Sequence, residues 1–157
     1  MGQTTPSKNH IVAISENRRA RFDYEILETF ECGLVLLGTE VKSLRDKHVS
    51  FSDAYAIIKG GEVFLLGLNI EPYKNSSYFG HTPDRTRKLL LNAREIKKIS
   101  KALAIKGQTL VPLKLYFKNG RAKVLIGIAK GKSSVDKRDT IKKRDTDRQI
   151  ARVMRRG

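Results

Sequence analysis

The sequence predicts a mainly β protein: a small, closed or nearly closed antiparallel β-barrel with two or three short helices and a basic C-terminal tail. Apolar residues alternate with polar ones in several segments, as in half-buried strands. Two-residue turn signals join neighbouring segments into hairpins. The 157 residues, 39% of them hydrophobic, are enough for one domain with a modest core.

The first strand is predicted over residues 22–32. The even positions are apolar except for Glu28, and most of the odd positions are polar, so one face should be buried. Cys32 lies on the apolar side, where we expect a packed thiol. Gly33 then leads into the apolar run 34–37, which is predicted to be buried on both sides.

Two hairpins are predicted, with turns at Gly60-Gly61 and Asn119-Gly120, which tolerate positive φ. The strands that they join cover four segments: 54–59, 62–70, 110–118 and 121–130. Pro112 indicates an edge position or a bulge. The residues of the second hairpin that are expected to point inward are Val111, Leu113, Leu115, Phe117, Ala122, Val124, Ile126 and Ile128.

Asn92 is expected to cap the clearest helix, with Glu95 completing a capping box and Gly107 ending it. Leu91 and Ile96 are placed to form its hydrophobic staple. A second short helix should begin near Gly38, and a third should cover residues 17–21. The second helix is predicted to turn Val41 and Leu44 inward and Lys42 and Arg45 outward.

Charge indicates the kind of partner. The chain has 32 Lys and Arg against 16 Asp and Glu, a net charge of +16, which attracts polyanions. Nucleic acid is the expected partner; anionic lipid and acidic protein are the alternatives. No apolar run is long enough to cross a membrane, the N-terminus is too polar for a signal peptide, and the single cysteine excludes an intramolecular disulfide. These features predict a cytoplasmic protein.

Nothing in the sequence predicts a catalytic residue, a metal site or a cofactor. The three histidines stand alone, and no phosphate-binding glycine motif occurs. One alternative is a Mg²⁺-dependent nuclease, in which several carboxylates would gather around the metal. Those carboxylates are Glu25, Glu28, Glu31 and Glu40. The simpler interpretation is that they pair with neighbouring arginines.

Binding features are richer. Residues 17–21 contain three arginines, which suit phosphate and can stack on bases. The long segment 71–88 interleaves aromatic and cationic residues, a combination suited to unpaired RNA. The residues concerned are Tyr73, Lys74, Tyr78, Phe79, His81, Arg85, Arg87 and Lys88. Solvated surface is the alternative interpretation for both segments.

The ends of the chain differ from its centre. Residues 1–9 are a polar lead, 10–130 form the predicted domain, and 131–157 form a basic tail. From Lys130 onward the chain has 11 Lys and Arg, 4 Asp and few apolar residues, so this stretch should be disordered when free. Its apolar stripe and its lack of helix breakers predict a helix that forms on an anionic partner.

Five collinear blocks resemble the small protein B family, the bacterial SsrA-binding proteins that are partners of transfer-messenger RNA. They are NRRARFDYEILETFECGLVLLGTEVKSLR (17–45), TRKLLLNAREI (86–96), LVPLKLYFKNGRAKV (110–124), AKGK (129–132) and DKRDTIKKRD (136–145). The resemblance runs from about residue 10 to residue 156. It implies an OB-like antiparallel barrel with three helices that binds the tRNA-like domain of transfer-messenger RNA at its elbow.

The resemblance also implies a role in trans-translation, in which the protein enters stalled ribosomes with this RNA. The tail would become helical in the vacant mRNA channel, against small-subunit rRNA near the decoding centre. We expect no membrane or small-molecule partner and a monomer on the RNA. The RNA-facing residues carried over by position are Asn17, Arg19, Arg21, Glu31, Lys42, Arg45, Leu90 and Asn92. The tail residues are Lys130, Gly131, Lys132, Asp136, Lys137, Arg138, Ile150, Val153 and Met154.

Some of these positions have a second interpretation. Glu31 would accept a hydrogen bond from the RNA or would orient an arginine, Asn92 is also the helix cap, and Leu90 is also a candidate core residue. The chain departs from the family at Val135, where Tyr or His is usual, and at Phe22, where some members have His. Besides the nuclease, a generic ribosomal or single-strand-binding OB module is the alternative function.

Overall fold

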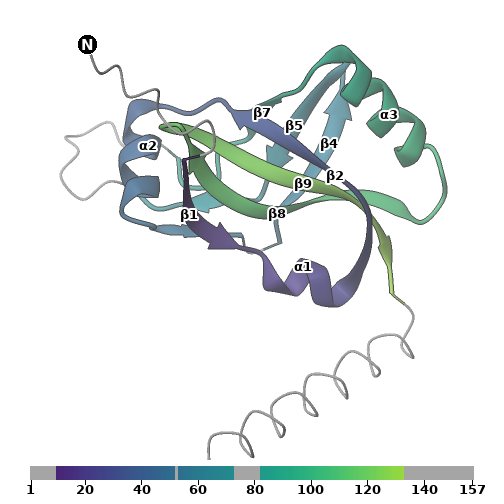
Figure 1. The fold of residues 1–157 in the computed structure, drawn as a ribbon, viewed down its shortest axis with the longest axis horizontal. Coiled ribbons are helices and arrows are strands. Elements are labelled where there is room, and N and C mark those ends of the chain that lie inside the picture. Colours follow the sequence, from purple (N-terminus) through teal and green to yellow (C-terminus); the bar gives the residue numbers. More distant parts are fainter. Residues whose placement is uncertain (1–9, 52, 73–81, 133–157) are drawn as a thin grey trace, which may run out of the picture.

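A computed structural model describes residues 10–51, 53–72 and 82–132. In this part of the chain, strands predominate and three short helices lie around the sheet (Figure 1). The elements are β1 (Ile11–Glu16), α1 (Arg18–Asp23), β2 (Tyr24–Leu34), α2 (Gly38–Arg45), β3 (Val49–Ser50), β4 (Tyr55–Lys59), β5 (Glu62–Leu66), β6 (Asn69–Ile70), β7 (Arg87–Leu90), α3 (Ala93–Leu103), β8 (Gln108–Lys118) and β9 (Arg121–Gly131). The predicted fold class, mainly β with short helices, is confirmed.

The main sheet closes into a ring. Its strand order is β1-β8-β4-β5-β7-β2-β9, every pairing is antiparallel, and β8 also pairs with β9. The other edge of β8 is shared between β1 and β4, and the contact with β4 rests on the pair Ala56 and Leu110. The predicted closed or nearly closed barrel is therefore confirmed, with its weakest seam between β4 and β8.

Both predicted hairpins form, and their turns have the expected backbone. Gly60 and Gly61 have φ of 60° and 75°, and Asn119 and Gly120 have φ of 51° and 79°. The strand predicted over residues 62–70 was wrong in its length. It breaks at Gly67, which has φ of 77° and lies against the backbone of residues 53 and 54, so that β6 pairs with β3 instead.

Two β-bulges separate the buried side chains into two clusters. The register shifts in β8 between Pro112 and Lys114, as predicted from the proline, and in β2 between Ile26 and Glu28. A bulge moves the following residues to the other face of the sheet. The predicted inward alternation of β8 was therefore only half right, because Val111 and Leu113 pack into a second, smaller cluster under α1. In the same hairpin Leu115, Phe117, Val124, Ile126 and Ile128 lie in the main core, and Ala122 packs against it.

The beginning of β2 also differs from the prediction. Helix α1 continues to Asp23, so Phe22 is helical and the strand starts at Tyr24. The helix is fixed by Asn17, whose backbone N–H donates to the carbonyl of Leu113 at 2.7 Å, and by the burial of Ala20 in the smaller cluster. These tertiary contacts outweigh the period-two pattern of the sequence.

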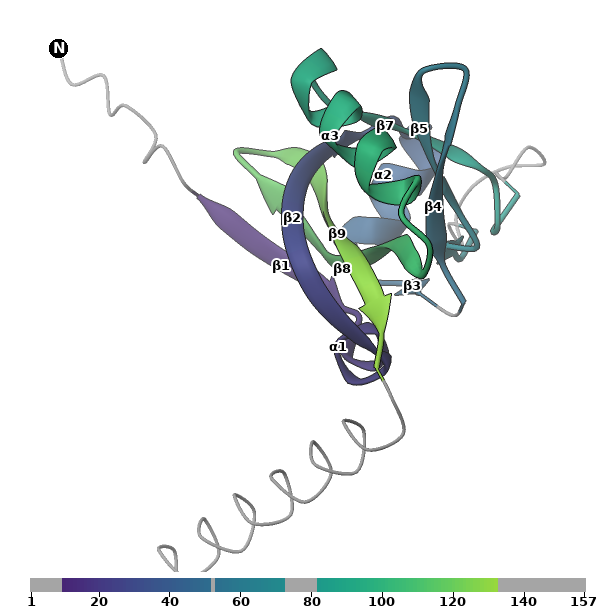
Figure 2. The ribbon, with the colours of Figure 1, turned by 90° about the vertical axis from the view of Figure 1, so that its right-hand side faces the viewer.

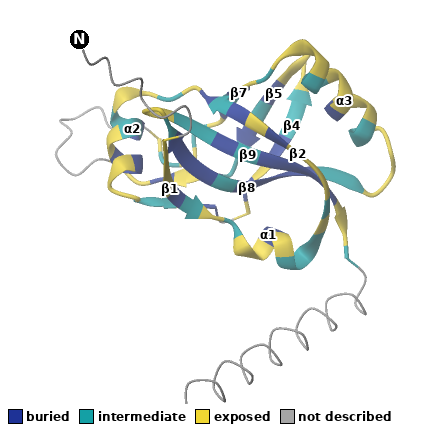
Figure 3. Ribbon diagram, in the orientation of Figure 1, coloured by how far each residue is buried: buried dark blue, intermediate teal, exposed yellow. Residues whose placement is uncertain are grey.

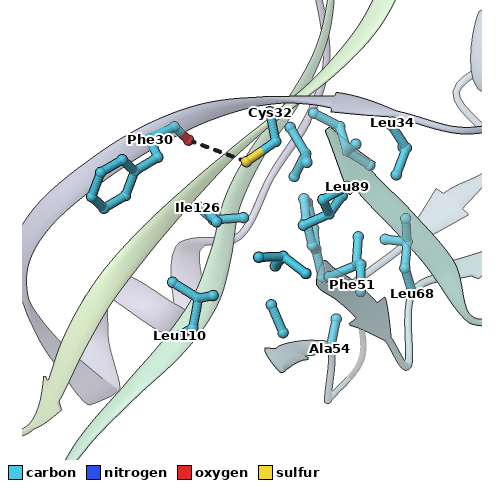
Figure 4. Close-up of a cluster of buried hydrophobic side chains, with 14 of the residues drawn as sticks. Phe30, Cys32, Leu34, Phe51, Ala54, Leu68, Leu89, Leu110 and Ile126 are labelled. Atoms are coloured by element: carbon cyan, nitrogen blue, oxygen red, sulfur yellow. Dashed lines mark hydrogen bonds between the residues drawn. The ribbon is translucent and has the colours of Figure 1, made fainter. Parts of the chain in front are cut away.

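The main core fills the inside of the barrel (Figures 3 and 4). Cys32 is fully buried in it, its thiol lies 3.8 Å from the carbonyl oxygen of Phe30, and burial raises its pKa to about 12. The packed thiol is therefore confirmed. The run 34–37 was predicted to be buried throughout, but Val35 and Leu37 are exposed because the sheet ends at Leu34.

The predicted capping box of α3 is confirmed. Asn92 Oδ1 accepts from the backbone N–H of Glu95 at 2.9 Å, and Glu95 Oε1 accepts from the N–H of Asn92 at 3.2 Å. Ile99 buries the inner face of the helix, which ends at Leu103, and the following turn ends at Gly107 with φ of 87°. Helix α2 buries Leu44 and leaves Lys42 and Arg45 exposed, as predicted.

Candidate nucleic-acid interface

The eight predicted RNA-facing residues lie in two groups at opposite ends of β2. This strand has 11 residues, a length of roughly 35 Å when extended, and it curves past β9 from α1 to its pairing with β7 (Figure 2). We call the group at its beginning the α1 patch; it consists of Asn17, Arg19 and Arg21. We call the other group the β2-end face; it consists of Glu31, Lys42, Arg45, Leu90 and Asn92.

In the α1 patch two side chains are available and one is engaged. The Arg19 side chain is 82% exposed, and its Nε lies 3.4 Å from Asp23 Oδ2. Arg21 Nε lies 3.8 Å from Glu16 Oε1 at the surface. Ion pairs this exposed are weak, so phosphate can compete for both guanidinium groups. Asn17 accepts from the N–H of Ala20 at 3.2 Å and donates to the carbonyl of Pro112 at 2.9 Å, so it holds α1 on the β8 bulge.

The beginning of the predicted tail lies beside the α1 patch. Lys130 and Gly131 belong to β9, where Gly131 is opposite Tyr24, and the N–H of Lys132 donates to the carbonyl of Asp23 at 3.0 Å. The chain therefore leaves the barrel next to α1. Val135 and the aromatic residues of segment 73–81 lie outside the described residues. So do the other predicted tail residues, which are Asp136, Lys137, Arg138, Ile150, Val153 and Met154.

Glu31 is an anchored carboxylate on the outside of the barrel. Tyr116 donates its hydroxyl to Oε2 at 2.6 Å, and Lys118 donates to Oε1 at 3.2 Å. The hydrogen bond from Tyr116, followed by that from Lys118, lowers the pKa of Glu31 despite partial burial. The carboxylate is therefore ionised at neutral pH. The alternative that it orients an arginine was wrong, since its partners are a tyrosine and a lysine.

One row of residues crosses the outside of the barrel beside Glu31. Leu90 of β7 is opposite Gly33 of β2, Gly33 is opposite Lys123 of β9, and Lys123 is opposite Tyr116 of β8. Paired residues share a face of a sheet, so the side chains of Leu90, Lys123 and Tyr116 all lie on the outer face, on which Gly33 has no side chain. Leu90 is 53% exposed, which makes the core interpretation of this residue wrong.

A buried ion cluster holds α2 in place. Glu40 is fully buried; it accepts from Arg87 Nε and from Arg85 Nη2, each at 2.6 Å, and from the backbone N–H of Leu37 at 2.8 Å. Arg87, also fully buried, donates to the carbonyls of Leu68, Arg85 and Pro83. Burial alone raises the pKa of Glu40, but its arginine partners and the Leu37 N–H together lower it.

This cluster corrects one prediction from the sequence. Arg87 was expected among the RNA-binding cations of segment 71–88, yet it serves the fold, while Lys88 pairs with Glu62 at 2.8 Å. Glu40 accepts from the backbone N–H of Leu37 as Glu95 does from that of Asn92, but the leucine side chain has no acceptor to complete a capping box, so the sequence gives only a weak signal for the start of α2. The arginine partners of Glu40 lie 45 and 47 residues away in the sequence, so no local pattern indicates them.

The carboxylates of the nuclease alternative do not come together. Glu40 is buried with its arginines, Glu31 is held by Tyr116, and Glu28 lies 3.8 Å from Lys98. Within residues 10–51, 53–72 and 82–132, no group of three or more His, Cys, Asp or Glu side chains is arranged to hold a metal ion. In the same ranges no helix has the length and apolar character needed to span a bilayer.

A strongly basic antiparallel barrel with exposed cations at both ends of one strand is a nucleic-acid-binding module. The chain belongs to the SmpB protein family, whose model matches residues 14–156. Relatives include the SsrA-binding proteins of Streptococcus mutans, 54% identical over 90% of this chain and 92% of the relative, and of Bdellovibrio bacteriovorus, 52% identical over 94% and 97%.

The fold has a counterpart among solved structures. A chain from a structure described as "tmRNA-SmpB: a journey to the center of the bacterial ribosome" is 50% identical to this chain and superposes with a TM-score of 0.65. The match covers 78% of this chain and 87% of that one. The family resemblance inferred from the sequence blocks is confirmed.

Proposed function

We propose that this protein binds the tRNA-like domain of transfer-messenger RNA, SsrA, and takes it to stalled ribosomes, where it supports trans-translation: ribosome rescue and tagging of incomplete peptides. The observation that carries the proposal is the family match over residues 14–156, together with relatives that are SsrA-binding proteins. The net charge of +16 supplies long-range attraction to RNA.

The two surface groups have different proposed roles on the RNA. Arg19, Arg21, Lys42 and Arg45 would meet phosphates, since they are exposed cations. Glu31 would accept a hydrogen bond from a base edge or a 2′-hydroxyl, because an ionised carboxylate is an acceptor only. Asn17 and Asn92 would act by holding the starts of α1 and α3, where their side chains are already engaged.

The tail would bind the ribosome. The predicted unit 131–157 begins with two residues that still pair with the barrel, Gly131 in β9 and Lys132 at Asp23. We propose that the remainder of the tail, up to residue 157, forms a separate unit that folds in the vacant mRNA channel near the decoding centre, against small-subunit rRNA. A cationic segment suits this place because the channel is walled by RNA phosphate. Full-length mRNA would compete for the same space, so the tail would test whether the channel is vacant.

We further propose that the protein is not an enzyme and that it acts in the cytoplasm, as a monomer when bound to RNA. The engagement of Glu31 and Glu40 with other side chains supports a binding role over metal-dependent cleavage. Incubating labelled transfer-messenger RNA with the protein and Mg²⁺ should leave the RNA intact. Shortened RNA would contradict the non-enzymatic assignment.

A titration tests the main proposal. The protein should bind the tRNA-like domain of transfer-messenger RNA far more tightly than bulk tRNA at physiological salt. With roughly six phosphates contacted, log K should fall against log[salt] with a slope near −5. Equal affinity for both RNAs would instead favour a generic RNA-binding barrel. Removing residues 136–157 should spare RNA binding and abolish peptide tagging, and loss of both would contradict the separate role of the tail.

A further inference from the structure

A pocket lies beside α1, at the weakest seam of the barrel. Its volume is about 320 Å³, which is at the lower end of the range for binding sites. One wall comes from α1 and the start of β2, and the other from the turn before β4, from Tyr55, and from Thr109 and Val111 of β8. The ladder between β4 and β8 consists of the pair Ala56 and Leu110, so the two strands leave room beside it. We call this space the α1 pocket.

The α1 pocket carries a negative charge in a strongly positive protein. Asp23 lines one wall and Asp53 the other, while Arg19 is the one cation among the described residues of the lining. The Asp53 side chain is exposed, and within the described ranges it forms no hydrogen bond or ion pair. Tyr24 and Tyr55 add aromatic walls. Carboxylates beside aromatic rings suit a cationic side chain, and they repel the phosphate of RNA.

The C-terminal tail leaves the barrel at the rim of the α1 pocket. Gly131 is opposite Tyr24, and the N–H of Lys132 donates to the carbonyl of Asp23 at 3.0 Å. The end of β9 therefore lies against two residues of the pocket lining, beside α1 (Figure 2). Any cation that follows Lys132 closely in the sequence starts its path at the pocket.

The sequence supplies such cations at a short distance. Residues 133–157 contain nine Lys and Arg, of which Lys137 and Arg138 come first. The five residues from Lys132 to Lys137 span up to roughly 17 Å when extended, whereas α1, with six residues, is only about 9 Å long. Both side chains can therefore reach the far wall of the pocket at Asp53.

The tether compensates for the weakness of an exposed ion pair. A surface pair between separate molecules contributes little and is screened by salt. A short flexible linker instead gives the attached group an effective concentration in the millimolar range. A weak seat for one cation is thus occupied by the tail of the same chain before a free cation or another protein competes for it.

We propose that the α1 pocket holds a cationic side chain of the tail, from Lys137 or Arg138, between Asp53 and Asp23 when the protein is free. The contact keeps the beginning of the tail on the barrel and leaves the stretch from residue 141 onward outside the pocket. On the ribosome, rRNA phosphate would replace the two carboxylates and release this segment. That release rests on the proposed function, whereas the contact in the free protein does not.

The test uses the full-length protein without RNA, and its readout is the set of backbone amide signals in NMR spectra. Replacing Lys137 and Arg138 with glutamine should shift the signals of Asp53, Tyr55 and Thr109. Raising the salt concentration should shift the same signals in the same direction, because an exposed pair is screened. The matched control is Lys142→Gln with Lys143→Gln, which removes the same charge further along the tail and should leave these signals in place.

A change in the pocket should also be seen from the tail. Asp53→Asn keeps the shape of the side chain without its charge and should shift the signals of residues 136–139. Asp46→Asn, at an exposed carboxylate outside the pocket lining, should not. Thermal unfolding shows that both variants are folded.

Charge reversal provides the strictest test. Asp53→Lys should abolish the salt dependence of the Tyr55 and Thr109 signals, and adding Lys137→Asp and Arg138→Asp should restore it. Failure of this restoration would overturn the inference.

The remaining outcomes also decide the question. An equal response to the two pairs of tail variants would indicate general attraction without a seat in the pocket and would overturn the inference. No response to any tail variant would leave the pocket to a cation of another protein, and a response only after transfer-messenger RNA is added would make RNA the occupant; both would overturn it. None of these results affects the preference for the tRNA-like RNA, which tests the proposed function separately.

Discussion

The hydroxyl of Tyr116 lies 2.6 Å from Oε2 of Glu31, although the strands that carry these residues, β8 and β2, are separated by β9. Tyr116 is buried, with 8% of its surface exposed, so its ring is fixed by packing and its hydroxyl is fixed by the carboxylate. The pKa of Tyr116 is raised, first by burial and then by Glu31, so its proton stays on the hydroxyl and donates to Glu31. The carboxylate of Glu31 is thus oriented by a well-packed side chain on the same outer face of the barrel.

Tyr116→Phe should therefore weaken RNA binding without changing any residue of the proposed interface. Loss of a hydrogen bond to a charged group costs about 1.5 to 3 kcal/mol, and we expect the lower part of this range for stability because Glu31 is exposed. RNA affinity should fall several-fold. Urea unfolding and RNA titration are the measurements, with Tyr55→Phe on an exposed tyrosine as control. Equal affinities for Tyr116→Phe and the natural protein would contradict the orienting role.

The lowered pKa values predict how stability depends on pH. Glu31 and Glu40 have lower pKa values folded than unfolded, so the folded state binds fewer protons in acid. Their contribution to the free energy of unfolding is complete above pH 4.5, the ordinary value, and disappears as the pH falls through the folded values. Unfolding followed between pH 7 and pH 3 should show this loss. The loss of stability in acid should be smaller in Tyr116→Phe, because the hydrogen bond that lowers the pKa of Glu31 is missing. The same pH profile in this variant and in the natural protein would contradict the link between Tyr116 and the pKa of Glu31.

Breaking the buried cluster of α2 should be far more damaging. Glu40→Gln leaves the fully buried guanidinium of Arg87 without its ionic partner, and removing one member of such a pair costs about 3 to 5 kcal/mol. Arg85→Gln should cost less, because the Arg85 side chain is 32% exposed. Chemical unfolding measures both. The double variant Glu40→Gln, Arg87→Gln should be less destabilised than the sum of its single variants, and simple additivity would contradict the coupling.

Local patterns in the sequence predicted much of the barrel, and the exceptions share one physical cause. The turns at Gly60 and Asn119, the cap at Asn92 and the bulge at Pro112 depend on neighbouring residues, so the sequence could indicate them. The extension of α1 to Asp23 and the burial of Arg87 depend on contacts with residues far away in the chain. The same holds for the site: charge predicts that cations are exposed, whereas the anchoring of Glu31 by Tyr116 requires the register of three strands.

Salt dependence distinguishes phosphate contacts from the other contacts of the β2-end face. Lys42 and Arg45 are exposed on one side of α2, so replacing both with glutamine should weaken RNA binding and make the slope of log K against log[salt] less steep by roughly one to two units. Leu90→Ala removes no charge and should weaken binding at an unchanged slope. Titrations at four salt concentrations check both. An unchanged slope in the double variant would remove α2 from the phosphate contacts.

Gly127 of β9 is closely packed, so a substitution that adds a side chain there should destabilise the fold. A Cβ on Gly127 of β9 would lie 3.0 Å from both Ile26 Cγ2 and Leu113 Cδ1, the side chains that the two bulges turn toward the smaller cluster. Overpacking a core site typically costs about 1 to 3 kcal/mol, and Leu113 is fully buried, so a shift of its side chain would disturb the smaller cluster. Gly127→Ala should therefore lower the free energy of unfolding by about this amount.

The matched control is Gly38→Ala in α2, where a new methyl group meets nothing within 4 Å and a helix position gains a better helix former, so its stability should be equal or slightly higher. Because a methyl group on Gly127 would press on Leu113, which shares the smaller cluster with Ala20, the variant should also loosen the packing of α1, and protection of the α1 amides against hydrogen exchange should fall first. If Gly127→Ala is as stable as Gly38→Ala, the smaller cluster has room for an additional methyl group, and the close packing of Ile26 and Leu113 against Gly127 is contradicted.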